Sequence, residues 1–183
     1  MSSSLKITKK SARDYILYSA IIVVGIILDQ LTKWLSVKFL SVVETVPIIK
    51  NVIHLTYVEN RGAAFGMFKD QRWVFMTTST VMIIALIAYL YLGLAENKLY
   101  EISIAMIISG GIGNMIDRIA LKYVIDFIDF RLINFAVFNG ADSFVCVGAG
   151  LLVLALILEM KNEVKKENAL KQSSASITKE DNE

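Results

Sequence analysis

The feature that most constrains the fold is an apolar segment from Trp73 to Leu94 that carries no charged residue. A helix needs about 20 consecutive apolar residues to cross the hydrocarbon core of a bilayer, and this segment is long enough. The mean hydropathy of the chain is +0.57 and 55% of its residues are hydrophobic, which is more than soluble domains usually have. The sequence therefore predicts a membrane protein.

Three more apolar segments predict three more transmembrane helices, at about 15–39, 101–117 and 142–160, in addition to 73–94. The first of them begins like the apolar part of a secretory signal peptide, but no small-residue cleavage site follows it. We therefore expect it to remain in the chain as a helix. The third helix contains several glycines near its end, which allow helices to pack closely in a bilayer.

The segments 40–72 and 118–141 are less hydrophobic and are predicted to lie outside the membrane. Pro47 prevents a continuous helix in the first of them. Val52–Val58 and Phe127–Leu132 have the composition or alternation of short strands, which could pair with each other. The predicted fold is an all-α membrane protein, a four-helix bundle with a small extracytoplasmic β-element.

The two ends of the chain are polar. Residues 1–14 form a basic N-terminus, and residues 161–183 form a charged, serine-rich tail that is expected to be disordered. Four spans place both ends on one side of the membrane. Lysines and arginines divide almost evenly between the two sides, so the basic N-terminal cluster decides the orientation and both ends are predicted to be cytoplasmic. Asp29 and both segments outside the membrane then share the outer face.

The composition argues against several classes of site. One cysteine and one histidine in the whole chain argue against a metal centre built on these residues. The net charge of +2 is too small, and its basic residues too dispersed, to suggest a nucleic-acid partner. A thiol protease pair of Cys146 and His54 is disfavoured, because Cys146 lies within an apolar helix where a thiol reacts poorly.

Asp126 and Asp142 are the most informative pair, because each lies at the edge of an apolar segment and the loop between them allows them to meet. Two neighbouring carboxyl groups cannot both ionise at low cost, so they share a proton. One can then activate water while the other protonates the substrate. Asp142 begins a helix, which favours its ionised form. Spacing alone also allows Asp142 to be a helix cap and Asp126 a surface carboxylate.

Other polar residues near the predicted helix ends have structural explanations as well. Asp29 and Lys33 are four residues apart, so a local salt bridge is the simplest interpretation. Asp117 and Arg118 could merely mark the membrane interface. Asn114 is harder to explain in this way, because an amide at the end of an apolar helix needs partners, and it can orient a carboxylate or a substrate peptide.

Several segments of the chain, in order, resemble the conserved boxes of the lipoprotein signal peptidases (signal peptidase II), a family of bacterial membrane aspartyl peptidases. They are Asp29–Lys33, Asn60–Phe65, Gly110–Arg118, Val124–Phe127 and Phe138–Ser143. The resemblance extends over nearly the whole chain between the polar ends. It implies a four-helix bundle with a small β-element that holds the substrate outside the membrane.

The resemblance also implies a function. Asp126 and Asp142 match the family's catalytic aspartates. Positions that bind the substrate or support the pair are matched by Asp29, Lys33, Asn60, Gly62, Asn114, Arg118 and Asn139. The implied enzyme is an aspartic endopeptidase that removes the signal peptide from diacylglyceryl-modified prolipoproteins by cutting just before the lipidated cysteine. It would act as a monomer in the bacterial cytoplasmic membrane, near the outer face and in contact with lipid, with no metal or organic cofactor.

Two other functions remain as alternatives. A small ion- or proton-coupled transporter would also use carboxylates in a membrane, but it predicts them at mid-membrane depth, and transporters commonly contain inverted repeats. No such repeat is evident in this sequence, and Asp29, Asp126 and Asp142 are predicted at one edge. A scaffold subunit without enzymatic activity would leave the clustered aspartates and asparagines without a purpose.

Overall fold

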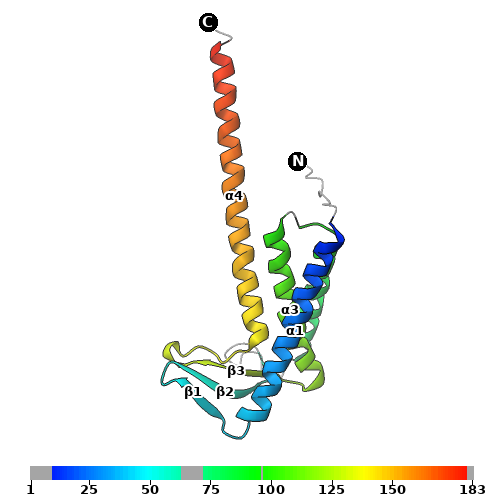
Figure 1. Ribbon diagram of the computed structural model, residues 1–183, viewed down its shortest axis with the longest axis vertical. Helices are drawn as coiled ribbons and strands as arrows, with labels where there is room; N and C mark the ends of the chain where they lie inside the picture. The colour runs from blue at the N-terminus through cyan, green and yellow to red at the C-terminus, as the bar shows by residue number, and fades with distance from the viewer. Residues whose placement is uncertain (1–9, 63–71, 96, 181–183) are drawn as a thin grey trace.

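The computed structural model describes residues 10–62, 72–95 and 97–180, and these form a helical bundle with a small sheet at one end (Figure 1). The long helices are α1 (Ala12–Leu40), α2 (Arg72–Tyr91), α3 (Lys98–Ala120) and α4 (Gly140–Glu180). Each of the four contains a stretch that is long and apolar enough to cross a membrane. The predicted fold class is confirmed.

Helix α3 is the centre of the bundle, because it packs against each of the other three helices. Its contact with α4 is close enough to require glycine: a Cβ atom on Gly110 would collide with the main-chain oxygen of Ala141. A cluster of buried apolar side chains, including Tyr18, Leu90 and Ile108, joins α1 and α2 to α3. The helices therefore hold α3 and the first turn of α4 in a fixed position.

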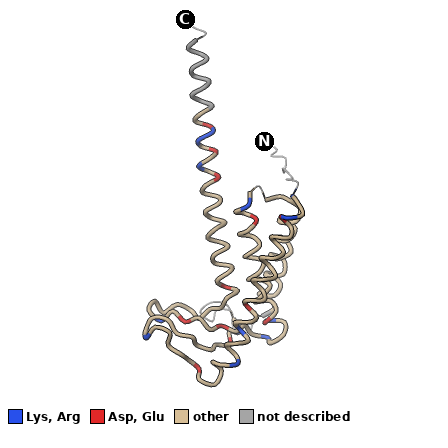
Figure 2. Tube along the Cα trace, viewed as in Figure 1, with Lys and Arg blue, Asp and Glu red and all other residues tan. Residues whose placement is uncertain are grey.

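Large apolar side chains remain exposed along the outer surface of the helices, for example Val24, Ile84 and Leu156. Lipid tails solvate such side chains, so this surface is expected in a bilayer. Figure 2 shows that the charged residues of the bundle gather toward its two ends and leave the middle largely apolar. The bundle thus has the charge distribution of a membrane-spanning domain.

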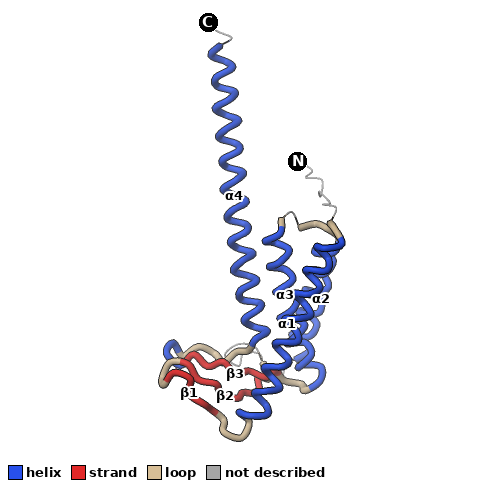
Figure 3. The backbone as a smooth tube through the Cα atoms, in the orientation of Figure 1, coloured by secondary structure: helices blue, strands red, loops and turns tan. Residues whose placement is uncertain are grey.

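The sheet has three strands in the order β1 (Thr45–Ile49), β2 (Ile53–Asn60) and β3 (Val124–Phe130), with both neighbouring pairs antiparallel. It lies where α1 ends and α4 begins, and it projects sideways beneath α4 (Figure 3). The pairing of β2 with β3 joins the two segments that the sequence predicted to lie outside the membrane. It also joins the two halves of the chain.

The sequence predicted two short strands and missed the third. Pro47, interpreted only as a helix breaker, lies in β1 at the edge of the sheet, where a residue without a main-chain N–H is tolerated. Strand β3 begins at Val124, before the predicted start at Phe127. Asp126 is therefore held in a strand and not in a loop.

The predicted helix ends agree with the observed ends to within a few residues, except at the end of α4. The sequence predicted that the helix ends near residue 160 and that a disordered tail follows, whereas α4 continues to Glu180. The extension is rich in lysine and glutamate, which have high helix propensity. Predictions for residues 1–9, for Ala63–Phe65 of the second family-like segment and for residues 181–183 lie outside the described residues.

Candidate active site

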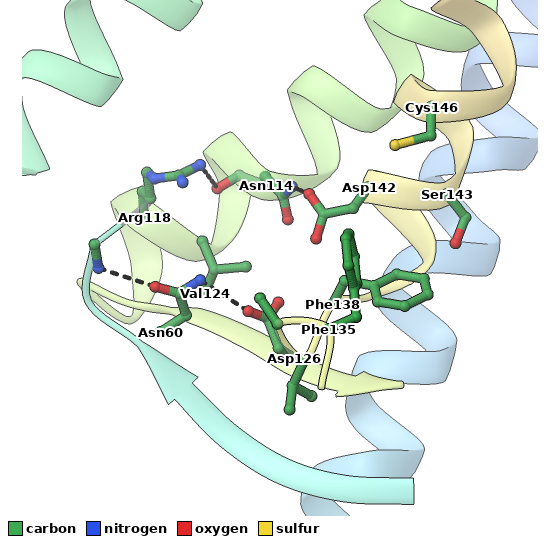
Figure 4. A pocket seen from close by; sticks show the side chains of 13 residues that line it. Asn60, Asn114, Arg118, Val124, Asp126, Phe135, Phe138, Asp142, Ser143 and Cys146 are labelled. Carbon is green, nitrogen blue, oxygen red and sulfur yellow. Dashed lines mark hydrogen bonds between the residues drawn. The ribbon is translucent and has the colours of Figure 1, made fainter. Parts of the chain in front are cut away.

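Asp126 of β3 and Asp142 in the first turn of α4 both point toward one cavity of about 390 Å³ (Figure 4). The cavity lies at the end of the bundle that carries the sheet. One wall is apolar and is formed by Val124 and by residues 135–138. Polar side chains of Asn60, Asn114 and Arg118 complete the lining. The fold thus brings two carboxyl groups from different elements into one hollow.

Asp126 is 1% exposed, and two amide groups hold its carboxyl oxygens. Asn60 Nδ2 donates to Oδ2 at 2.9 Å, and Asn139 Nδ2 donates to Oδ1 at 2.7 Å. Burial raises the pKa of Asp126 to about 7; the nearby charge of Asp142 raises it further, while the two amide hydrogen bonds act in the opposite direction. This carboxyl group therefore carries a proton for much of the time near neutral pH.

Asp142 is held from two sides. Asn114 Nδ2 donates to its Oδ1 at 2.8 Å, and the main-chain N–H of Asn139 donates to its Oδ2 at 3.2 Å. Asn139 is the residue before α4, and its Oδ1 accepts the main-chain N–H of Asp142 at 2.9 Å in return. The helix cap is therefore Asn139, and Asp142 occupies the first turn, where the helix dipole favours negative charge.

Asn139 connects the two aspartates, because its side chain bonds Asp126 and its main chain bonds Asp142. Its side chain is fully buried, and Nδ2 also donates to Asn114 Oδ1 at 3.0 Å. Asn60, in turn, uses its Oδ1 to accept the main-chain N–H of Gly62 at 3.0 Å, which fixes the chain where it leaves β2. Asparagines from three different elements therefore position the pair.

Arg118 lies one helical turn beyond Asn114 on α3 and lines the same cavity. Its Nη1 donates to the main-chain oxygen of Asn114 at 3.3 Å, and its guanidinium carbon lies 5.6 Å from the ring centre of Phe75. The positive charge acts on both Asp126 and Asp142. Arg118 is therefore placed to attract a negative charge that develops in the cavity.

Behind the cavity, Lys33 joins two buried carboxylates. Its Nζ lies 2.9 Å from Asp29 Oδ2, 2.9 Å from Asp117 Oδ2 and 2.9 Å from Asn114 Oδ1. All three charged side chains are 2% exposed or less. We call Asp29, Lys33 and Asp117 the outer ion cluster, where "outer" refers only to the end of the bundle that carries the sheet. The local salt bridge between Asp29 and Lys33 does form, but it is one part of this larger cluster.

Each carboxylate of the outer ion cluster also holds a main-chain amide directly before one of the two cavity aspartates. Asp29 Oδ1 accepts the N–H of Ala141 at 2.7 Å, and Asp117 Oδ2 accepts the N–H of Ile125 at 3.1 Å. Residues 141 and 125 precede Asp142 and Asp126. One lysine therefore links the backbone positions of both aspartates.

The sequence interpretation missed Asp117, which it paired with Arg118 as an interface marker. One signal was available, because Asn114 and Asp117 are three residues apart and so share a face of α3. The thiol pair is not formed either. Cys146 lines the cavity, whereas the ring of His54 lies in the sheet, within hydrogen-bonding distance of Thr45 and Asn51.

The arrangement suits acid–base chemistry on a substrate with apolar parts. A buried carboxyl group whose pKa is raised to about 7 lies beside one that is held by hydrogen-bond donors, in a cavity with an apolar wall. Such a pair can remove a proton from water and donate one to a carbonyl group. Among the described residues, no group of three or more His, Cys, Asp or Glu side chains is placed to hold a metal ion.

Comparison with known proteins gives, over most of the chain, the family that the sequence segments resemble. The family model for signal peptidase (SPase) II matches residues 21–158. The lipoprotein signal peptidase of Caldanaerobacter subterraneus subsp. tengcongensis is 49% identical over 142 residues, which cover 76% of this chain and 97% of that protein. The lipoprotein signal peptidase of Clostridium tetani is 44% identical over 149 residues, covering 80% and 96%.

The fold is also similar to that of a solved structure, a bacterial membrane enzyme determined by the in meso method at 2.3 Å resolution. The TM-score is 0.73 at 28% sequence identity, and the match covers 80% of this chain and 90% of the other. The matched part thus includes most of the described residues.

Proposed function

The chain belongs to the signal peptidase II family, and from this we propose that it is an aspartic endopeptidase in which Asp126 and Asp142 carry out the reaction. Family membership makes it a peptidase of a bacterial membrane that processes prolipoproteins. The proposal adds the catalytic type and the residues. We further propose that the enzyme cuts just before the diacylglyceryl-modified cysteine and so releases the signal peptide.

The observation that carries the proposal is that Asn139 links Asp126 and Asp142 at one cavity. Asp142 accepts hydrogen bonds at the start of a helix, and these favour its ionised form. Asp126 is buried, and its pKa of about 7 favours its protonated form. Two buried carboxyl groups in one cavity can share a single proton, as hydrolysis by two carboxyl groups requires.

In the proposed reaction, the carboxylate of Asp142 takes a proton from a water molecule as the water oxygen attacks the scissile carbonyl carbon. Asp126 donates its proton to the carbonyl oxygen, which gives a neutral tetrahedral diol. The C–N bond then breaks: the proton held by Asp142 passes to the leaving amine, and Asp126 recovers a proton from the diol as the new carboxyl group forms. No proton or electron pair is gained or lost by the enzyme over the cycle.

The position of the cavity supports a substrate anchored in the membrane. The cavity is lined by residues from the last turns of α3 and the first turns of α4, where a signal peptide that spans the bilayer would emerge. Its apolar wall suits the side chains and lipid of such a substrate, while its open end admits water. We infer that this end faces the outside of the cell, with both termini in the cytoplasm. A single chain supplies all these residues, which supports a monomeric enzyme.

The proposal is tested by processing of a purified, diacylglyceryl-modified prolipoprotein by Asp126→Asn and Asp142→Asn variants. We expect each to lower kcat by about 10³-fold or more, because each removes an acid or a base from the reaction. Asp129→Asn is the matched control, since Asp129 lies on the same strand but bonds Thr56 and Arg131. A near wild-type rate in a normally folded Asp126 or Asp142 variant would refute the assignment.

The transporter alternative predicts carboxylates at mid-membrane depth. Asp29, Asp126 and Asp142 instead belong to the network at the sheet end of the bundle. Flux measurements in proteoliposomes test this alternative directly. Ion-coupled flux that disappears in both aspartate variants would favour transport over proteolysis.

A further inference from the structure

The end of the sheet farthest from α1 exposes several large apolar side chains. Ile48 and Ile49 at the end of β1 are 60% and 52% exposed, and Leu132 and Ile133 are 69% and 68% exposed. The last two belong to the short 3₁₀ helix η2 (Arg131–Ile133), which follows β3. We call Ile48, Ile49, Leu132, Ile133 and the nearby Phe135 the distal tip.

The parts of the distal tip lie together, because the main-chain N–H of Arg131 donates to the carbonyl oxygen of Val52 in the β1–β2 turn at 3.0 Å. In Figure 3, η2 is the short helical turn at the free end of the sheet, away from α4 but level with its first turn. If the helices cross a bilayer, this level is its interface with water. Apolar side chains gathered there can reach the acyl chains.

We propose that the distal tip inserts into the leaflet on the active-site side of the bilayer, with the acyl chains of that leaflet as its partner. Val147 and Val153 of α4 are exposed as well, so the helix and the tip both present apolar side chains that acyl chains can solvate. Lys50, between the apolar end of β1 and the turn, is exposed and suits the phosphate groups at this depth. The sheet is then held to the membrane at both ends, by the bundle and by the tip.

Insertion would also link the bilayer to the active-site cavity. Phe135 belongs to the distal tip and lines the cavity, together with Ala136, Val137 and Phe138. The segment 135–138 therefore runs from the inserted tip to the reacting aspartates. This part of the inference rests on the proposed function, and it assigns the segment as the side by which the lipid-modified end of a prolipoprotein enters. Insertion itself requires only that the helices span the membrane.

The chain contains a matched control for exposure. Val42 is 84% exposed, more than any residue of the distal tip, but it belongs to the turn after α1. Figure 1 places this turn at the bottom of the molecule, just beyond the end of α1 and across the sheet from α4. If the helices cross a bilayer, this level lies in the water beyond it. A site that is apolar and exposed but outside the membrane is therefore available in the same protein.

The test places a nitroxide spin label at Ile133→Cys or at Val42→Cys in a Cys146→Ser background, which removes the chain's one native thiol. The full chain is reconstituted in nanodiscs of phosphatidylcholine and phosphatidylglycerol. We expect the label at 133 to collide more often with oxygen, which concentrates in acyl chains, than with a water-soluble nickel chelate. The label at 42 should show the opposite preference.

Equal access of the nickel chelate to both labels would overturn the proposal. So would protection of the label at 133 that appears only after a prolipoprotein is added, or only at high protein density in the disc. The first of these would assign the tip to the substrate, and the second to another copy of the chain. The measurement needs no catalysis, so it should give the same answer in an Asp126→Asn background. Failure of the insertion proposal can therefore be distinguished from failure of the catalytic proposal.

The proposed entry of the lipid-modified substrate along segment 135–138 is tested by the double variant Leu132→Ser/Ile133→Ser, with Val42→Ser as control. All three side chains are exposed, so neither variant should unfold the protein. For a lipid-modified substrate in nanodiscs, we expect the double variant to raise KM several-fold with kcat unchanged, and the control to change neither. An unchanged KM in the double variant would overturn entry along segment 135–138.

Discussion

Buried ion clusters lie at both ends of the bundle, and their bonds lead to different places. At the end that carries the sheet, called the outer end below, Lys33 joins Asp29 and Asp117. These two carboxylates also accept main-chain N–H groups directly before the two cavity aspartates. At the opposite end, called the inner end below, Glu101 is buried against Lys10 and Tyr18, and we call these three residues the inner cluster. Burial of charge is similar in the two clusters, so burial alone does not identify a functional site.

The inner cluster joins the start of α1 to the connection between α2 and α3. Lys10 Nζ donates to the main-chain oxygen of Ala95 at 2.8 Å, and Lys98 pairs with Asp14 and lies 3.7 Å from Glu101. These bonds link helix ends to one another. The comparison therefore predicts that the outer cluster serves activity and stability, whereas the inner cluster serves stability alone.

The largest effect is expected for Lys33→Met at the outer end. Removing the lysine leaves two buried carboxylates without their shared partner, which is expected to cost about 3–5 kcal/mol of stability. The backbone beside both Asp126 and Asp142 then loses its fixed position, and a shift of this kind is expected to lower kcat by about 10²-fold. Thermal unfolding in detergent and processing kinetics on the folded fraction measure the two effects separately. A wild-type kcat in that fraction would show that the outer cluster, like the inner one, serves stability alone.

The matching change at the inner end is Glu101→Gln. It leaves Lys10 buried without its ion-pair partner, so a similar loss of stability, about 3 kcal/mol, is expected. We expect kcat per folded molecule to remain at the wild-type value, because the inner cluster has no bond to the cavity aspartates. The same unfolding and processing measurements apply. A large fall in kcat would show that the difference between the clusters is not functional.

The third prediction concerns pH and the outer end alone. Asp126 has a pKa of about 7 in the folded protein against an ordinary 3.8, so between about pH 4 and 7 the folded state holds a proton that the unfolded state releases. The contribution of Asp126 to stability is therefore greatest at acid pH and should fall by up to about 4 kcal/mol as the pH rises to 7. Thermal unfolding from pH 4 to 8 measures the slope.

The control for the pH effect is Asp126→Asn, which cannot titrate and should flatten the slope. Asp129→Asn provides the opposite case on the same strand. Hydrogen bonds from Arg131 and Thr56 outweigh burial and lower the pKa of Asp129, so this carboxyl group stabilises the fold above its ordinary pKa and loses that contribution on acidification. An unchanged slope in Asp126→Asn would remove Asp126 as its source.

The smallest effect is expected for helix packing near the outer end. Gly110→Ala forces a Cβ against the main-chain oxygen of Ala141, so α4 must move, at a cost of about 1–3 kcal/mol. Gly150→Ala is the control, because no atom lies within 4 Å of its Cβ position. It should be neutral or stabilise the helix by up to about 1 kcal/mol. Equal melting temperatures would show that close approach of α3 and α4 is not required.

The sequence predicted much of the fold because the bilayer imposes a length that can be recognised locally. Each span is an uninterrupted apolar segment, and this property does not depend on distant residues. Of the predicted site residues, Asn60 and Asn114 line the cavity and Asn139 bonds Asp126, which lines it, whereas Asp29 holds the main chain behind it. Their roles in substrate binding stay predictions.

The prediction was weaker where local pattern and tertiary context differ. Strand β1 was missed, because Pro47 is a poor strand residue except at an edge, and only the assembled sheet shows which strand is the edge. The charged tail of α4 has the composition of a disordered segment and also of an exposed helix, and composition could not decide between them.

By itself, the sequence determined that four apolar helices cross a membrane and that aspartates and asparagines gather at one end. Only the tertiary structure decided which of these residues bond one another. Asp29 holds the amide of Ala141 and Lys33 pairs with Asp117, in each case a partner far away along the chain, and no local pattern encodes such partners. The physical reason is that a span depends on the transfer of local apolar surface into lipid, whereas a buried charge is stable only beside partners that packing brings to it.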